Sequence, residues 1–326
     1  MMPDRLVLAL GLAFAALAAM PQSQAATQRI GYLSNNTPEA AAPYVAAFRE
    51  GLRAQGLVEG RDVTIEFRYA NRRFTELPAL ARELVAMKVD VIVAHVTEPS
   101  LAAHAATRTI PIVIVGVGDP IGVGLVTNLS RPGGNVTGSA GMTVETAGKT
   151  VALLKEAVPG LKRVGVLWNP ANATYQRQLL REVQAAAREL AIEARTYPMT
   201  DLEAIEQSFQ AMGKDRVGGV VALSDPALVA HGQRIAALAR AARLPSIGGL
   251  PPYADWGGLV AYGPDFVALS RDAADPVARI LRGAKPGDLA VSRPSRFEFV
   301  VNAKTAKAIG ATIPPALQLR ADRVIE

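Results

Sequence analysis

Short apolar runs alternate with longer amphipathic runs along most of this 326-residue chain. The clearest apolar run, residues 112–115, contains only isoleucine and valine and lies between Pro111 and Gly116, which is typical of a buried parallel strand. Runs with helical periodicity, such as 39–55 and 173–190, follow predicted strands. Regular alternation of strands and helices indicates parallel sheets that are covered by helices on both faces. The pattern therefore predicts an α/β fold.

The predicted strands are too many for one compact sheet of ordinary size. Two passages rich in helix breakers divide the chain, one at Gly133-Gly134 and one at 248–252. We therefore predict two doubly wound, Rossmann-like lobes that are joined by hinge crossovers and have a ligand cleft between them. The first lobe is expected to contain residues 29–138 and 258–285, and the second lobe residues 139–250 and 290–326.

The first 25 residues have the pattern of a secretory signal peptide. Arg5 precedes the uncharged apolar run 6–19, and Ser23-Gln24-Ala25 fits a small-x-small cleavage site. The alternatives are a membrane anchor or a buried helix, but the run is shorter than the ~20 apolar residues that a membrane span needs. We predict that residues 1–25 are removed and that the mature protein lies in the periplasm.

Composition and charge narrow the classes of partner. The chain has no cysteine, which excludes disulfide bonds and a lipid attached to an amino-terminal cysteine. Its net charge of +6 is spread along the chain, and no basic run is longer than two residues, as at Arg72-Arg73. No basic tract is interleaved with aromatic residues, so we do not expect nucleic acid as a partner.

Six predicted strand ends carry a small polar residue and a proline. In open α/β sheets, ligands bind beyond the carboxyl ends of the strands. Proline suits the first turn of a helix, and Ser, Thr, Asn and Asp cap helices. Two interpretations stay open: capping alone, or a cleft in which helix amides hold a polar or anionic group. The six passages are 34–38, 95–99, 116–120, 168–172, 223–226 and 261–265.

Sites for cofactors and metals are not indicated. The glycines at 116, 118 and 122 have one residue too many for the dinucleotide fingerprint and follow the fourth strand rather than the first. The histidines are isolated from other residues at metal-ligand spacing, although His95 stands at a strand end where it could touch a ligand. We therefore predict no cofactor and no metal. The chain's histidines are His95, His104 and His231.

A catalytic constellation is also not indicated. Ser34, Ser139 and Ser224 are not in a nucleophile-elbow context. The carboxyl groups of Glu98, Asp119 and Asp225 could form a catalytic pair, but as helix caps or partners of an ammonium group they need no reaction. The prediction is that the protein is not an enzyme.

Several passages of the chain are typical of one protein family. On the basis of these passages, the chain resembles ABC-transporter substrate-binding proteins of the family that includes tryptophan- and tyrosine-binding members. The resemblance extends over nearly all of residues 28–326. The arginine-proline-glycine-glycine-asparagine passage and the carboxyl-terminal tail are the most specific to that family. The passages are 29–33, 48–52, 56–60, 65–70, 118–126, 129–138, 297–302, 304–306 and 313–315.

This resemblance implies a type I periplasmic-binding-protein fold that closes by hinge motion around a small molecule. It also implies an ABC-transporter permease in the inner membrane as partner, and we expect a monomer. The resulting hypothesis is the solute-binding component of an ABC uptake system. An enzyme or a ligand-sensing module that uses the same cleft is the alternative.

Carried onto this chain, the resemblance implies ligand contacts at the strand ends. For an amino-acid ligand, Thr97, Ser139 and backbone amides would hold the carboxylate, and Asp225 would hold the ammonium group. Tyr253, Tyr262 or Trp168 would stack on its side chain, although Trp168 could equally fill the core. An amide, a small carboxylate or an aromatic acid would fit as well as an amino acid. The expected ligand-binding residues are Asn36, Thr37, Thr97, Asp119, Ser139, Asn169, Asp225, Tyr253 and Tyr262.

Overall fold

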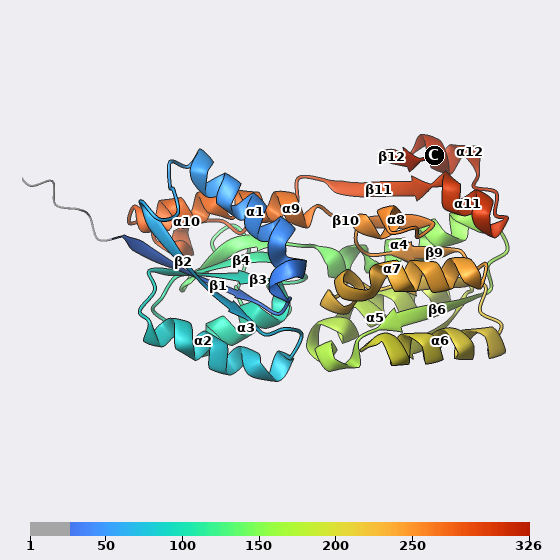
Figure 1. Cartoon of the computed structure of the whole chain (residues 1–326), viewed down its shortest axis with the longest axis horizontal. Coiled ribbons are helices and arrows are strands. Elements are labelled where there is room, and N and C mark those ends of the chain that lie inside the picture. The colour runs from blue at the N-terminus through green and yellow to red at the C-terminus, as the bar shows by residue number, and fades with distance from the viewer. Residues whose placement is uncertain (1–26) are drawn as a thin grey trace, which may run out of the picture.

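Two α/β lobes lie side by side in the protein, each built on its own sheet (Figure 1). The structure is a computed structural model, and it describes residues 27–326. The predicted signal peptide lies outside the described residues. The two-lobed α/β architecture predicted from the alternation of strands and helices is confirmed.

The first lobe has a five-stranded sheet in the order β2-β1-β3-β4-β5, and all its strand pairs are parallel. Every residue of β3 and β4 is buried, because helices cover both faces of the sheet. The strands are β1 (Gln28–Ser34), β2 (Val63–Tyr69), β3 (Val91–His95), β4 (Ile112–Val117) and β5 (Val136–Ala140). The helices are α1 (Pro38–Ala54), α2 (Leu77–Ala86) and α3 (Thr97–Ala106), with a 3₁₀ turn at Phe74–Glu76.

The second lobe has a seven-stranded sheet in the order β12-β11-β10-β9-β8-β6-β7, in which β10 and β11 are antiparallel. Its strands are β6 (Arg163–Trp168), β7 (Glu193–Pro198), β8 (Gly219–Ala222), β9 (Ser246–Gly248), β10 (Val260–Pro264), β11 (Phe297–Asn302) and β12 (Arg323–Ile325). Its helices are α4 (Thr143–Ala157), α5 (Ala173–Glu189), α6 (Leu202–Lys214), α7 (Pro226–Ala241), α8 (Pro252–Asp255), α11 (Ala303–Ile309) and α12 (Pro315–Leu319), with a 3₁₀ turn at Pro170–Asn172.

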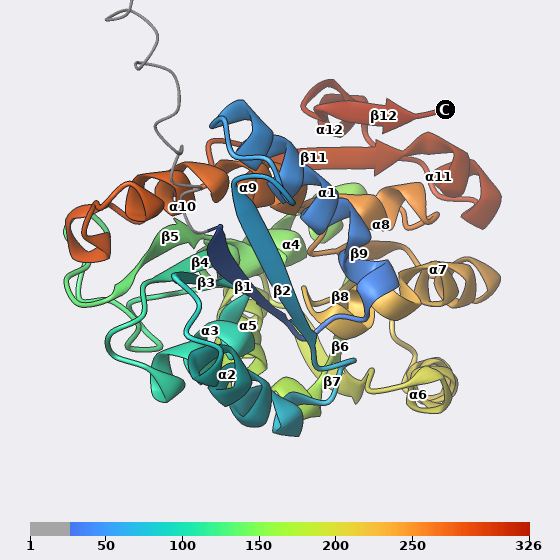
Figure 2. The same cartoon turned by 60° about the vertical axis from the view of Figure 1, so that its left-hand side comes forward.

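The chain returns to the first lobe after β10. Helices α9 (Phe266–Asp272) and α10 (Ala274–Leu281) pack against α1 and against strands β4 and β3 (Figure 2). A 3₁₀ turn at Pro286–Asp288 follows. Beyond it the amide of Ser292 donates to Gly138 and its carbonyl accepts from Ala140, so this segment runs along β5. The chain then crosses back to form β11.

The sheet membership differs from the expected lobe boundaries in three short segments. Strand β10 pairs with β9 and β11 in the second sheet rather than in the first, because its apolar residues extend the second core. Strand β5 continues to Ala140 in the first sheet, and the segment near Ser292 lies on its edge. The hinge therefore lies just beyond these strand ends.

A β-bulge explains the glycines near the hinge. The register between β4 and β5 shifts between Ile114 and Val117. Gly138 has φ 126, and a Cβ atom there would overlap the carbonyl oxygen of Ile114. The hydroxyl of Ser139 fills the bulge by accepting a hydrogen bond from the amide of Gly116 at 3.1 Å. Only glycine fits this close approach of the two strands.

Candidate functional site

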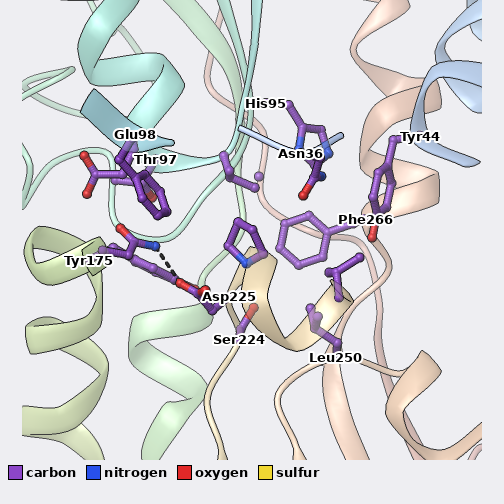
Figure 3. Close-up of a pocket in the computed structure, with 16 residues that line it drawn as sticks. Asn36, Tyr44, His95, Thr97, Glu98, Tyr175, Ser224, Asp225, Leu250 and Phe266 are labelled. Atoms are coloured by element: carbon purple, nitrogen blue, oxygen red, sulfur yellow. Dashed lines mark hydrogen bonds between the residues drawn. The ribbon is translucent and has the colours of Figure 1, made fainter. Parts of the chain in front are cut away.

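A cavity lies where the two lobes meet, at the carboxyl ends of the parallel strands (Figure 3). About 540 Å³ of space between its atoms, including space open to solvent, belongs to it, but only about 40 Å³ is room for the centre of a water-sized molecule. Its lining comes from the loops after β1, β3 and β4 in the first lobe, from α1 and α9, and from the starts of α5 and α7 in the second. The lining residues are Asn36, Tyr44, Phe74, His95, Val96, Thr97, Glu98, Gly116, Asn172, Tyr175, Ser224, Asp225, Pro226, Val229, Leu250 and Phe266.

Asp225 places a carboxylate in the wall of the cavity. It is the N-cap of α7, where Oδ1 accepts from the amide of Ala227 at 2.8 Å. Side-chain amides supply its other donors: Asn169 at 2.9 Å, Asn172 at 2.7 Å and Gln176 at 3.2 Å. Burial raises the pKa of Asp225, and these hydrogen bonds oppose the rise. All four donors are neutral, so they stabilise the carboxylate without balancing its charge.

Glu98 adds a second carboxyl group from the opposite lobe. It stands in the first turn of α3, and its Oε1 atom is buried without a hydrogen-bond partner among the described residues. Burial raises the pKa of Glu98, the backbone amide of Tyr175 lowers it, and the charge of Asp225 raises it further. None of the sixteen lining residues, all of them described, is lysine or arginine. The cavity therefore carries negative charge with no cation in its wall.

Aromatic rings line the other side of the cavity. The imidazole of His95 lies between two rings, with its centroid 4.7 Å from that of Tyr44 and 6.3 Å from that of Phe266. Leu250 extends this apolar wall from the second lobe (Figure 3). The cavity thus has a polar side near Glu98 and an apolar side near Phe266, which suits a ligand that is itself amphipathic.

The start of α3 has free amides at the cavity. Its N-cap is Val96, which has no side-chain acceptor and adopts φ 67 and ψ −173. This region is sparsely populated for a β-branched residue, and such strain is concentrated at ligand sites. Thr97 begins the helix, and its hydroxyl accepts from the amide of Gly118 at 3.3 Å. The amides of Thr97 and Glu98 are therefore available to a ligand, since Pro99 has no amide hydrogen and the amide of Ser100 donates to Val96.

Of the residues predicted from the sequence, Asn36, Thr97 and Asp225 line the cavity together. Asn169 lies behind it, where it donates to Asp225. Thr37 caps α1 by accepting from Ala40 at 3.3 Å. These placements bring the predicted first-lobe and second-lobe groups to one site, while ligand contact by each of them stays a prediction.

The other predicted residues lie outside the cavity lining. Asp119 closes a turn by accepting from the amide of Gly122 at 2.8 Å, and Ser139 is buried in the β-bulge. Tyr253 is fully buried, and its hydroxyl is 2.9 Å from that of Ser246. Tyr262 lines a smaller neighbouring cavity, and its hydroxyl accepts from Lys149 at 3.0 Å. In this conformation, hydrogen bonds and packing within the protein account for all four side chains.

Several lining residues were not predicted as ligand contacts. Tyr44 and Phe266 lie in amphipathic helices, where an aromatic residue is usually a core residue. Asn172 and Ser224 belong to strand-end passages that the sequence singled out. Ser224 directly precedes Asp225, whereas the proximity of Asn172 to Asp225 depends on the pairing of β6 with β8, which no local pattern reveals.

The two lobes are in contact around the cavity. The ring of Tyr175, from the second lobe, lies against Gly118, where a Cβ atom would overlap it. Across the lobes, Arg72 Nη1 is 3.3 Å from His231 Nε2. Since arginine can only donate, His231 must be neutral and accept at this nitrogen. These contacts join the two lobes beside the cavity.

Among residues 27–326, no helix is long and apolar enough to cross a membrane. The same part of the chain holds no group of three histidine, aspartate or glutamate residues that could bind a metal ion.

Known proteins are similar to this chain over most of its length. The chain is 27% identical over 265 residues to a tyrosine-binding protein of Clostridioides difficile (strain R20291), which covers 80% of this chain and 75% of the relative. A conserved domain protein from Vibrio cholerae has a TM-score of 0.82 at 29% identity, covering 91% of this chain and 99% of the other. An ABC domain from Streptococcus pneumonia in complex with L-Trp has a TM-score of 0.81 at 25% identity. The match covers 92% of this chain and 100% of the other.

The model of one protein family matches most of the chain. This family is described as ABC transporter substrate binding protein, and the match extends over residues 38–325. The two-lobed architecture is that of type I periplasmic binding proteins. The chain belongs to the family of ABC transporter substrate-binding proteins.

Proposed function

We propose that this protein is the receptor of an ABC uptake system and that it captures an amino acid, or a related amine, between its lobes. The observation that carries the proposal is the buried carboxylate of Asp225, which faces the cavity and is held only by neutral donors. A ligand ammonium group would balance this charge in a water-poor site, where ion pairing is strong.

The remaining parts of an amino acid also have partners of suitable chemistry. The free amides at the start of α3 can hold a carboxylate, which the helix dipole favours. The rings of Tyr44 and Phe266 can pack against an apolar or aromatic side chain. The relatives named for tyrosine and L-Trp support this choice of ligand class.

Capture would proceed by a population shift. A ligand that touches both lobes binds the closed state more tightly than the open state, so it moves the equilibrium toward closure. The receptor would act in the periplasm as a monomer, after removal of its signal peptide, and deliver its ligand to a permease. We further propose that it is not an enzyme, since its two cavity carboxyl groups are explained by charge recognition.

A thermal-shift experiment with matched ligands tests the charge requirement. The mature protein is melted with L-phenylalanine, with phenethylamine, which lacks the carboxylate, and with 3-phenylpropionate, which lacks the amine. A ligand at a hundredfold excess over its dissociation constant stabilises the folded state by about 2.7 kcal/mol. We expect the two amines to raise the melting temperature and the acid to have no effect. Stabilisation by the acid alone would refute the assigned role of Asp225.

A turnover assay tests the alternative that the protein is an enzyme. The same three compounds, and the carboxamides of the two that carry a carboxylate, are incubated with the protein and analysed by mass spectrometry. Unchanged compounds are expected. Conversion of any of them, without a shift in melting temperature, would favour an enzyme that uses the same cleft.

A further inference from the structure

The first-lobe wall of the cavity holds polar atoms that have no protein partner. His95 is 3% exposed, and neither of its ring nitrogens has a hydrogen-bond partner among the described residues. Asn35 does not line the cavity but follows Ser34, which pairs with His95 across β1 and β3, and neither of its side-chain amide atoms has a partner among the described residues. Unpaired polar atoms in a protein interior destabilise the fold. The unpaired ring nitrogens of His95 lie at the lining of the cavity, which suggests that a ligand supplies the missing bonds.

The imidazole of His95 is a neutral hydrogen-bonding group. Burial lowers the pKa of His95 to about 4, so the ring is uncharged at neutral pH. A neutral imidazole has one nitrogen that donates and one that accepts. The rings of Tyr44 and Phe266 pack near it, and Figure 3 shows His95 across the cavity from Asp225. The site therefore offers a carboxylate on one side and a neutral donor and acceptor on the other.

We propose that His95 is a specificity-determining residue that binds an uncharged hydrogen-bonding group, such as a hydroxyl, on the side chain of the ligand. The inference rests on the proposed function, because it assumes that the amine of the ligand is held near Asp225. A hydroxyl both donates and accepts, so it can pair with His95 in either tautomer. A hydrocarbon in the same place leaves the ring nitrogens unpaired, and sites of this kind reject such ligands strongly.

Two variants separate ligand recognition from packing. His95→Phe keeps a planar ring next to Tyr44 and Phe266 but removes both nitrogens. His95→Gln keeps one donor and one acceptor. Tyr32→Phe is the matched control, because the hydroxyl of Tyr32 is also buried without a partner but Tyr32 does not line the cavity.

Calorimetry with L-tyrosine and L-phenylalanine, which differ by one hydroxyl, gives the test. We expect the natural protein and Tyr32→Phe to bind tyrosine about ten- to a hundredfold more tightly than phenylalanine. The ratio should fall to about one in His95→Phe and be largely retained in His95→Gln. A tyrosine preference that survives in His95→Phe would overturn the proposal.

The melting temperature of the ligand-free protein gives an independent readout. If the unpaired imidazole serves ligand recognition and destabilises the ligand-free fold, its replacement should not lower stability. His95→Phe should therefore melt at the same temperature as the natural protein or higher. If neither amino acid binds the natural protein, the proposed ligand class fails, and this readout still decides the role of His95. A lower melting temperature for His95→Phe would show that the fold needs the imidazole, and would overturn the inference.

Discussion

The carboxylate of Asp225 caps a helix and also carries charge into the cavity. Its cap position holds the group at the start of α7, and the amides of Asn169, Asn172 and Gln176 fix its direction. This arrangement leaves the charge uncompensated until a cation arrives. The same donors keep the carboxylate in place when the site is empty, so little reorganisation is needed on binding.

Binding of an amine should depend on pH through the two cavity carboxyl groups. Burial raises the pKa of both Asp225 and Glu98, so each binds a proton more readily than in the unfolded chain. Ligand-free stability therefore falls as the pH rises from the ordinary pKa through the raised one. An ammonium ligand favours the ionised forms, so its affinity should weaken on acidification through the same range. Calorimetry of L-phenylalanine between about pH 7.5 and about pH 4.5 measures this.

The variant Asp225→Asn removes the charge and keeps the size of the side chain. We expect affinity for amine ligands to fall by about ten- to a hundredfold, which corresponds to the loss of a hydrogen bond to a charged group. Its circular dichroism spectrum should match that of the natural protein. An affinity within twofold of the natural value would contradict the assigned role. Asp201→Asn makes the same change at the exposed N-cap of α6, where Asp201 accepts from the amide of Ala204 outside the cavity lining, and this control should leave affinity unchanged.

The strand-end residues show how far the sequence could lead at the scale of single residues. Small polar residues at these positions were correctly related to helix starts: Thr37, Asp225 and Asn169 each accept from a backbone amide there. The sequence did not separate caps that line the cavity from caps that do not. That distinction depends on how the second lobe faces the first, which is a long-range property. Tyr44 and Phe266 were missed for the same reason.

At the scale of elements, the bulge between β4 and β5 sets the direction in which the chain leaves the first lobe. Gly116 and Gly138 both have positive φ, and the Ser139 hydroxyl ties them together. Helix α4 begins three residues after β5 ends. Because the end of β5 is held rigidly and the connection to α4 is short, bending at this crossover is confined to the residues between β5 and α4.

Replacing Gly138 with alanine should destabilise this bulge. The new Cβ atom would overlap the Ile114 carbonyl group, and φ 126 is strained for any residue with a side chain. We expect the free energy of unfolding to fall by about 2–4 kcal/mol, measured by urea denaturation. Gly134→Ala is the matched control: φ there is 63 but nothing lies within 4 Å of the added atom. It should cost about 1–2 kcal/mol. Equal effects of the two variants would refute the steric explanation.

The elements themselves were largely predictable, because strands such as 112–115 are apolar throughout and helices such as α5 are strongly amphipathic. The lobe to which some of them belong was not. Strand β10 lies between β9, which is near it in sequence, and β11, which is more than thirty residues away. Its antiparallel pairing with β11 depends on α9 and α10 first returning to the other lobe. Local patterns contain no information about such a detour.

At the scale of the whole molecule, the two lobes are joined by a contact that acid should weaken. His231 accepts from Arg72 across the lobes. Burial and Arg72 lower the pKa of His231, while Asp201 raises it. Because protonated His231 would repel Arg72, the closed state loses this contact as the pH falls through the lowered pKa.

This contact predicts a change in shape with pH. Small-angle scattering of the ligand-free protein should show a larger radius of gyration below the pKa of His231 than at neutral pH. The effect should be modest, since partly exposed ion contacts contribute about 1 kcal/mol or less. His231→Gln keeps an acceptor that does not titrate, and its radius should not change with pH over the same range. Identical pH profiles for both proteins would rule out this contact as the cause.

Helices α9 and α10 have a consequence for the order in which the protein can fold. They cover one side of the first sheet but are encoded after most of the second lobe. A growing or translocating chain therefore lacks part of the first core until about residue 281 has emerged, and lacks the edge next to β5 until Ser292 has followed. The amino-terminal half cannot reach its final stability early. For the export proposed above, in which a chain crosses a membrane channel unfolded, this topology would delay folding until most of the chain has crossed.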